Sequence, residues 1–176
     1  KYLNISINND LQNWVDLHIK NINSNGFWGN SISNPYLQFQ NGYHQYEILE
    51  YLNNNDVPWA KAADFVIKLA DKSGRFAPYP GGGGCYDYDA VFILTTKTID
   101  SNRYIETLSK TKESILSSRN IDGGYCESHY IRPRSIKNIS LALSHIFNSD
   151  IKSFPYILKR NITLQLNKNN RIKTHW

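Results

Sequence analysis

Residues 74 to 94 read Gly-Arg-Phe-Ala-Pro-Tyr-Pro-Gly-Gly-Gly-Gly-Cys-Tyr-Asp-Tyr-Asp-Ala-Val-Phe-Ile-Leu. Pro78, Pro80 and the four glycines exclude a continuous helix, because proline lacks an amide donor and glycine has a low helix propensity. The apolar residues that follow predict a helix from about residue 87 to residue 99. A loop that ends near Cys85 therefore brings two acids, Asp87 and Asp89, to the start of a helix.

These two acids have a structural and a functional interpretation. In the first, Asp87 caps the helix by accepting hydrogen bonds from its first amides, and Asp89 favours the positive end of the helix dipole. In the second, the glycines let the backbone approach a ligand, and an acid at the helix end does acid/base work. If Asp87 is the cap, Asp89 lies about 200° further round the helix, where we expect it to face a cavity.

The composition is typical of a globular protein. Of the 176 residues, 40% are hydrophobic and 20% are charged, and no apolar run approaches the roughly 20 residues that span a bilayer. The net charge is +5, but neither a zinc-finger spacing nor an RNA-binding aromatic motif is present, so nucleic acid is not a predicted partner. We expect one domain over residues 1–176. The two cysteines and the lack of a signal-peptide pattern indicate the cytoplasm, and the absence of methionine indicates a part of a longer protein.

Apolar residues at helical spacing recur along the whole chain, whereas no segment alternates apolar and polar residues as a strand would. The expected fold class is therefore all-α. The predicted helices cover about seven segments: residues 11–22, 38–52, 59–71, 87–99, 102–118, 133–147 and 153–166.

A repeat connects these helices. Phe27, Phe76 and Tyr125 are spaced 49 residues apart, and each lies beside glycine, after one predicted helix and before a loop that leads into another. Such a period predicts stacked helical hairpins, because a single hairpin cannot bury its own apolar face. We expect an arc, a solenoid or a partial α/α toroid.

The short motifs in these turns resemble a known superfamily. Asp122-Gly123-Gly124-Tyr125, Gly74-Arg75-Phe76 and the helix start from Gly84 to Val91 are similar to the repeats of α/α-toroid proteins, namely protein prenyltransferase β subunits and the squalene-cyclase group. The resemblance implies that the inner helices direct their N-termini to one end of a central cavity, which holds the ligand. It also implies a ring with about twice as many hairpins, completed by further sequence or by a second chain.

The resemblance implies the fold more firmly than the activity. The Asp-x-Asp-Asp acid of the cyclases is incomplete, since Ala90 follows Asp89, and the chain has no Asp-x-Cys for the zinc site of the prenyltransferases. Zinc ligation by Cys85, Asp87, Cys126 and His129 is conceivable but not favoured, because no paired Cys-x-x-Cys is present. The cofactor is left open, and no metal site is predicted.

Candidate site residues lie at the starts of the expected inner helices. His44 and Glu47 are one turn apart and can form an acid/base pair with Asp87 or Asp89 nearby. Tyr43, Gln40 and Cys85 are candidate ligand-binding residues. In the alternative interpretation, Tyr43 and His44 are hydrogen-bonding residues of a packed core.

A basic cluster lies at the start of the sixth predicted helix. Arg132 and Arg134, with His129, can bind phosphate, diphosphate or carboxylate. A solvated basic loop is the alternative. Two classes of function follow: an enzyme of the transferase, cyclase or lyase type that acts on a phosphorylated, isoprenoid or saccharide ligand, or a non-catalytic helical-repeat scaffold that binds a protein partner.

Overall fold

The computed structural model describes residues 9–31, 33–79, 82–97, 101–119, 123–125, 143, 146–147 and 151–166. These ranges contain helices and no β-strand, with one isolated bridge between Arg119 and Tyr125. The all-α prediction is therefore confirmed. The α-helices are α1 (Asn9–Lys20), α2 (Pro35–Tyr51), α3 (Trp59–Val66), α4 (Cys85–Thr95), α5 (Ile105–Ser117) and α7 (Phe154–Leu166), with 3-10 turns η1 (Ile67–Leu69) and η2 (Ser101–Tyr104).

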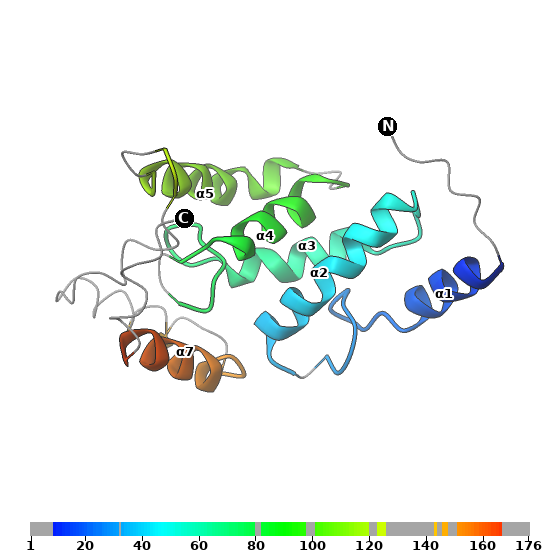
Figure 1. The fold of residues 1–176 in the computed structure, drawn as a ribbon, viewed down its shortest axis with the longest axis horizontal. Helices are drawn as coiled ribbons and strands as arrows, with labels where there is room; N and C mark the ends of the chain where they lie inside the picture. Colours follow the sequence, from blue (N-terminus) through cyan, green and yellow to red (C-terminus); the bar gives the residue numbers. More distant parts are fainter. Residues whose placement is uncertain are drawn as a thin grey trace.

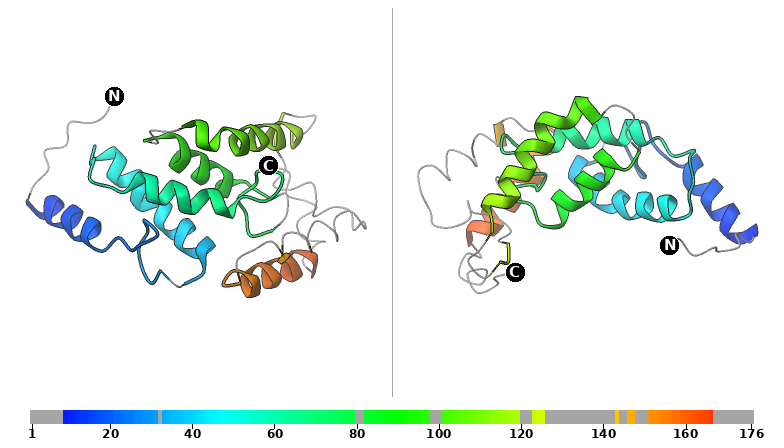
Figure 2. Two further views of the ribbon diagram at one scale, coloured as in Figure 1. Left: turned by 180° about the vertical axis from the view of Figure 1, so that it is seen from behind. Right: turned by 90° about the horizontal axis from the view of Figure 1, so that it is seen from above.

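From α3 to α5, helices that follow one another in the chain run antiparallel. In Figures 1 and 2, α4 runs back along α3, and α5 runs back along α4, while α2 and α4 run in the same direction. Helix α4 packs against both α2 and α3, so it lies at the centre of the described fold. No helix in the described ranges is both long and apolar enough to cross a membrane.

Three helices begin earlier than predicted, and α1 does so by two residues, at Asn9. Helix α2 begins at Pro35 rather than Gln38, because the Asn34 side chain accepts hydrogen bonds from the amides of residues 36 and 37 and Pro35 suits the first turn. Helix α4 begins at Cys85 rather than Asp87 and ends at Thr95 rather than Ile99. The predicted helix over residues 133–147 lies almost wholly outside the described residues.

Aromatic side chains fill the core between α2, α3 and the first turn. Phe27 contacts the Tyr46 ring edge-on at a centroid distance of 5.5 Å, and Tyr46 contacts Trp59 at 4.8 Å. The Tyr46 hydroxyl donates to the carbonyl oxygen of Gly26 at 2.6 Å. This single buried tyrosine therefore ties α2 to the preceding turn, and its ring extends the core to α3.

The turn after α1 is closed by an asparagine side chain. The Asn23 amide donates to the Phe27 carbonyl at 2.6 Å, and the Gly26 amide donates to the Asn23 carbonyl at 3.0 Å. The Asn23 side-chain oxygen accepts from the amides of Asn25 and Phe27, at 2.9 and 3.2 Å. Gly26 has a φ of +84°, which glycine adopts without steric cost.

The turn after η1 has the same hydrogen bonds 48 residues later. The Asp71 amide donates to the Arg75 carbonyl at 2.8 Å, and the Gly74 amide donates to the Asp71 carbonyl at 3.0 Å. The Asp71 carboxylate accepts from the amides of Ser73 and Arg75, at 2.8 and 3.0 Å. Gly74 has a φ of +76°. The two turns share one backbone conformation, with asparagine exchanged for aspartate.

The matching turns correct the predicted spacing. Phe27 takes the same place in its turn as Arg75, not as Phe76, because the two glycines, Gly26 and Gly74, are 48 and not 49 residues apart. Phe27 and Phe76 are both fully buried, so the apolar pattern alone does not reveal the shift by one residue. Gly123, 49 residues after Gly74, also has a positive φ, of +89°.

Candidate functional site

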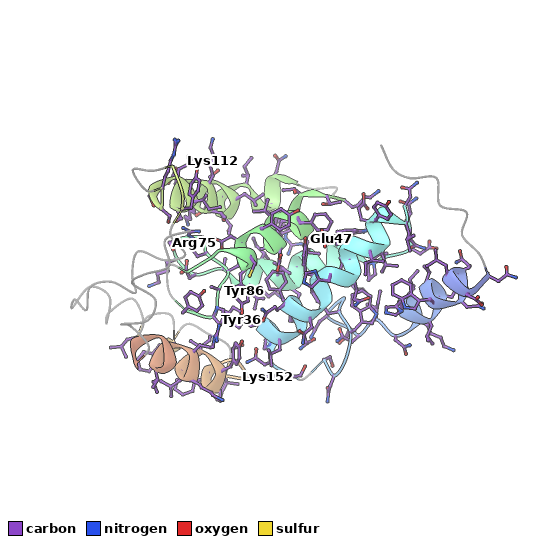
Figure 3. The ribbon with its side chains drawn as sticks, in the orientation of Figure 1. Tyr36, Glu47, Arg75, Tyr86, Lys112 and Lys152 are labelled. Carbon is purple, nitrogen blue, oxygen red and sulfur yellow. The ribbon has the colours of Figure 1, made fainter. Side chains whose placement is uncertain are left out.

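Arg75 and Asp87 form a buried ion pair at the start of α4. Their side chains are 5% and 2% exposed, and the Arg75 guanidinium donates through Nη1 to Asp87 Oδ2. The other carboxylate oxygen, Oδ1, accepts from the Phe76 amide at 3.0 Å. Arg75 Nη2 donates to the Ser114 carbonyl at 3.0 Å and to the Ser118 hydroxyl. The pair therefore joins the turn, α4 and the end of α5 (Figure 3).

This geometry overturns the predicted cap. The N-cap of α4 is Gly84, with a φ of +58°, and no side chain caps the helix. Asp87 lies within the first turn, and its carboxylate is directed to Arg75 and Phe76 instead of the first helical amides. Burial raises the pKa of Asp87, while hydrogen bonding to Arg75 and Phe76 opposes the rise.

Two of the consecutive glycines have a packing role. A Cβ atom on Gly83 would lie 1.8 Å from Asp87 Oδ2 and 2.5 Å from Arg75 Nη1. A Cβ atom on Gly82 would lie 1.7 Å from the Tyr79 ring. The loop therefore passes directly over the ion pair and an aromatic ring, and only glycine leaves room for them.

Gln38, in the first turn of α2, makes a link comparable to that of Asp87 in the first turn of α4. Its side chain is 4% exposed, and its carbonyl oxygen accepts from the side-chain amides of Asn23 and Asn25, each at 3.2 Å. Both residues tie the first turn of a helix to the preceding turn of the chain. Gln38 makes this link with neutral partners, whereas Asp87 makes it with the Arg75 guanidinium.

A cavity of about 680 Å³ lies at the N-terminus of α4, between α4 and α5. Cys85 and Asp87, two of the predicted site residues, line it. Asp89 does not line this cavity. The described lining residues are Arg75, Gly83, Gly84, Cys85, Asp87, Tyr88, Val91, Ile115, Ser118 and Tyr125.

Asp89 is on the other side of α4, against α2. It is 6% exposed and has no hydrogen-bond partner among the residues that the structure describes; its charged neighbours are His44 and Glu47. Burial is the main reason that the pKa of Asp89 is raised to about 6. Two smaller effects oppose each other: His44 lowers this pKa, and Glu47 raises it. A largely buried acid whose pKa is raised by burial, next to a second acid, is typical of a functional position.

Three further predicted site residues surround Asp89 from α2. His44 Nδ1 lies 3.6 Å from Glu47 Oε2, and their side chains are 70% and 49% exposed. Tyr43 is buried, and its pKa is raised by burial and by the neighbouring Glu47 and Tyr88. The Tyr43 ring meets Tyr88 edge-on at 6.1 Å. Tyr43, His44, Glu47 and Asp89 form what we call the α2–α4 acid site; Glu47 is labelled in Figure 3.

The other predicted site residues do not join this group. The Gln40 side chain accepts a hydrogen bond from the Tyr86 hydroxyl at 3.1 Å, and Tyr86 also interacts with Tyr156 of α7. Cys85 is exposed. His129, Arg132 and Arg134 lie outside the described residues, as does Cys126. Among the described residues, no three histidine, cysteine or acidic side chains form a group that could hold a metal.

Arg75 is the main residue that the sequence analysis missed. Arg75 lies in the Gly-Arg-Phe motif, whose local pattern predicts no role for it. One signal for a buried ion pair is present in the sequence. Arg75 is a basic residue between the turn glycine Gly74 and two apolar residues, Phe76 and Ala77, which are buried in the structure. An acid, Asp87, follows at the next helix start. Gln38 was missed because an amide at a helix start is not by itself unusual.

At about pH 8, we expect Asp89→Asn to raise the free energy of unfolding by about 1–3 kcal/mol. The pKa of Asp89 is raised to about 6 in the folded state, so ionisation above that pH opposes folding. Wild type regains this stability as the pH falls from 6 towards 4, and the difference between the proteins should disappear below 4. Urea unfolding across this range measures it. A constant difference at every pH would contradict the raised pKa.

The fold and the site define a helical protein with two acids in the first turns of a central helix: Asp87 in an ion pair with Arg75, and Asp89 beside His44 and Glu47. No family model, curated protein or solved structure matches the chain.

Proposed function

We propose that the chain is an α/α-repeat domain of the toroid type, with α2 and α4 as inner helices. The two turns with the same hydrogen bonds, 48 residues apart, support this architecture. Each turn glycine also approaches the backbone of the next outer helix: a Cβ atom on Gly26 would lie 2.7 Å from the Ala62 nitrogen, and one on Gly74 would lie 2.6 Å from the Thr111 nitrogen. One tertiary contact thus recurs with the turn.

We further propose that the α2–α4 acid site carries out acid/base chemistry on a bound ligand, with Asp89 as the proton donor or acceptor. The observation that carries this proposal is the burial of Asp89 without a hydrogen-bond donor in the described part of the chain. Its pKa of about 6 is suited to proton transfer near neutral pH. Asp87, in contrast, is fully engaged in the fold.

The charge around Asp89 limits the ligand chemistry. Asp89 and Glu47 are both acidic, so a phosphate or diphosphate placed here would meet like charge. A saccharide, an isoprenoid chain or a positively charged intermediate fits better, because the Tyr43 ring beside Glu47 provides aromatic surface within the acid site. A phosphate on the same ligand would need the basic residues Arg132 and Arg134.

The proposal is tested by a thermal-shift screen of wild type at about pH 5 and about pH 8. The panel contains neutral saccharides, uronic acids, nucleotide sugars and isoprenoid diphosphates. For any compound that is turned over, we expect Asp89→Asn to keep binding but to lose turnover by roughly 10²- to 10⁴-fold. Glu50→Gln is the matched control, since Glu50 is on α2 but pairs with Lys97 at 3.5 Å. Equal activity in Asp89→Asn and Glu50→Gln would refute the catalytic role.

A protein-binding scaffold is the second candidate, and one surface feature favours it. Leu37, Ile48 and Tyr51 of α2 are 40%, 42% and 42% exposed and lie on one stripe of the helix. Such a stripe is typical of a helix that contacts another chain. If the scaffold candidate is correct, light scattering should show association that Ile48→Glu abolishes. Association that is absent from wild type would leave the enzyme as the better candidate.

A further inference from the structure

A second cavity, of about 430 Å³, lies on the α1 side of α2 and has no part in the acid site. Its volume is within the roughly 300–1,000 Å³ of small-molecule sites. Residues from the end of α1, the following loop and α2 line it, among them His18, Trp28, Asn41 and Gln45. No aspartate, glutamate, lysine or arginine is among its described lining residues. An uncharged ligand is therefore favoured.

The polar groups of this cavity include one that the protein leaves unsatisfied. The carbonyl oxygen Oε1 of Gln45 is buried and has no hydrogen-bond partner in the part of the chain that the structure describes. A buried acceptor without a donor costs about 1–3 kcal/mol. A ligand hydroxyl that donates to Oε1 once the Gln45 amide turns towards the cavity would therefore bind favourably. Asn41, one turn earlier on α2, is exposed and adds both a donor and an acceptor.

The opposite wall of the cavity is rigid and aromatic. The Trp28 indole nitrogen donates to the His18 carbonyl at 2.8 Å, and the ring rests on Tyr46 at a centroid distance of 5.5 Å. His18 Nδ1 in turn donates to the Trp14 carbonyl at 3.1 Å. These bonds fix the Trp28 ring as an apolar surface, and Gly29 beside it leaves open space where a Cβ atom would stand.

We propose that this cavity binds a neutral saccharide, with Trp28 contacting the sugar ring and the amides of Asn41 and Gln45 binding its hydroxyl groups. A sugar has an apolar ring face and several hydroxyls that both donate and accept, which matches one aromatic surface and two uncharged amides. A charged sugar would bury its charge without a partner of opposite sign. The inference is independent of the acid chemistry at Asp89.

The test measures binding of glucose, galactose, N-acetylglucosamine, maltose and cellobiose by ligand-observed NMR and calorimetry, with glucuronate and glucose 6-phosphate as charged comparators. We expect saturable binding of at least one neutral sugar and about tenfold weaker binding of its charged comparator. Asn41→Ala and Gln45→Leu should each weaken that binding about tenfold. Asn55→Ala, an exposed amide in the loop after α2, is the control and should bind like wild type.

Asn41 is exposed, so its replacement tests the proposal even if Gln45→Leu disturbs the fold. The acid site is expected to keep ligand binding when Asp89 is replaced, so only the variants of this cavity assign the sugar to it. Three results would overturn the proposal: no neutral sugar binds to the folded protein, the charged sugars bind more tightly, or Asn41→Ala binds as well as Asn55→Ala.

Discussion

Asp87→Ala is expected to lower the free energy of unfolding by about 3–5 kcal/mol. The substitution leaves the Arg75 guanidinium, which is 5% exposed, without its counter-ion, and it removes the acceptor of the Phe76 amide. A buried charge that has lost its partner is more costly than a lost helix cap, which would account for about 1 kcal/mol. Urea denaturation followed by far-UV circular dichroism measures the loss.

The double variant Arg75→Met/Asp87→Leu is the control for this prediction. Replacing both charges with apolar side chains of similar size removes the unpaired charge, so the double variant should be more stable than Asp87→Ala. Asp89→Asn, two residues away, should not destabilise the protein at neutral pH. A loss below about 1 kcal/mol for Asp87→Ala would mean that the ion pair contributes little and that the acid acts as an ordinary residue of the first turn.

Gly74→Ala is expected to destabilise the protein by about 3 kcal/mol or more. The φ of +76° strains any residue with a Cβ atom, at a cost of about 1–2 kcal/mol. The new atom would also lie 2.6 Å from the Thr111 backbone nitrogen, which cannot move without shifting α5. The same denaturation experiment reports this loss.

Gly29→Ala is the matched control, because Gly29 has a φ of +82° but no atom within 4 Å of the Cβ position. It carries the backbone strain without the collision, so we expect it to lose only about 1 kcal/mol. The difference in unfolding free energy between Gly74→Ala and Gly29→Ala measures the cost of the collision with α5. Similar losses in both variants would show that backbone strain is the whole effect and that the turn does not pack tightly against the next helix.

Several features of the candidate site could be predicted from local sequence. His44 and Glu47 are one helical turn apart, so their proximity follows from the helix itself. Asp87 and Asp89 lie on different sides of α4 for the same reason, since residues two apart on a helix point in nearly opposite directions. The proximity of Asp89 to His44 could be predicted only by assuming that α2 and α4 are neighbours. The predicted repeat of helical hairpins led to that assumption.

The roles of the two acids could not be predicted in the same way. Whether an acid at a helix start caps the helix or pairs with a cation depends on which groups the rest of the chain brings to it. Arg75 reaches Asp87 because the turn at residues 71–75 folds back over the start of α4, and Gly83 leaves the space for the pair. Sequence patterns report the period of a helix, but they do not report the distance between two turns.

The sequence by itself determined the helices, the loops between them and the recurrence of a glycine turn, because these depend on spacing, on backbone conformation and on the lack of an amide donor in proline. Only the tertiary structure decided that Phe27 matches Arg75 in its turn, that Asp87 is held by the fold, and that Asp89 is buried without a donor among the described residues. These facts arise where segments far apart in the chain come within hydrogen-bonding distance, and solvent exclusion there sets the energy of each charge.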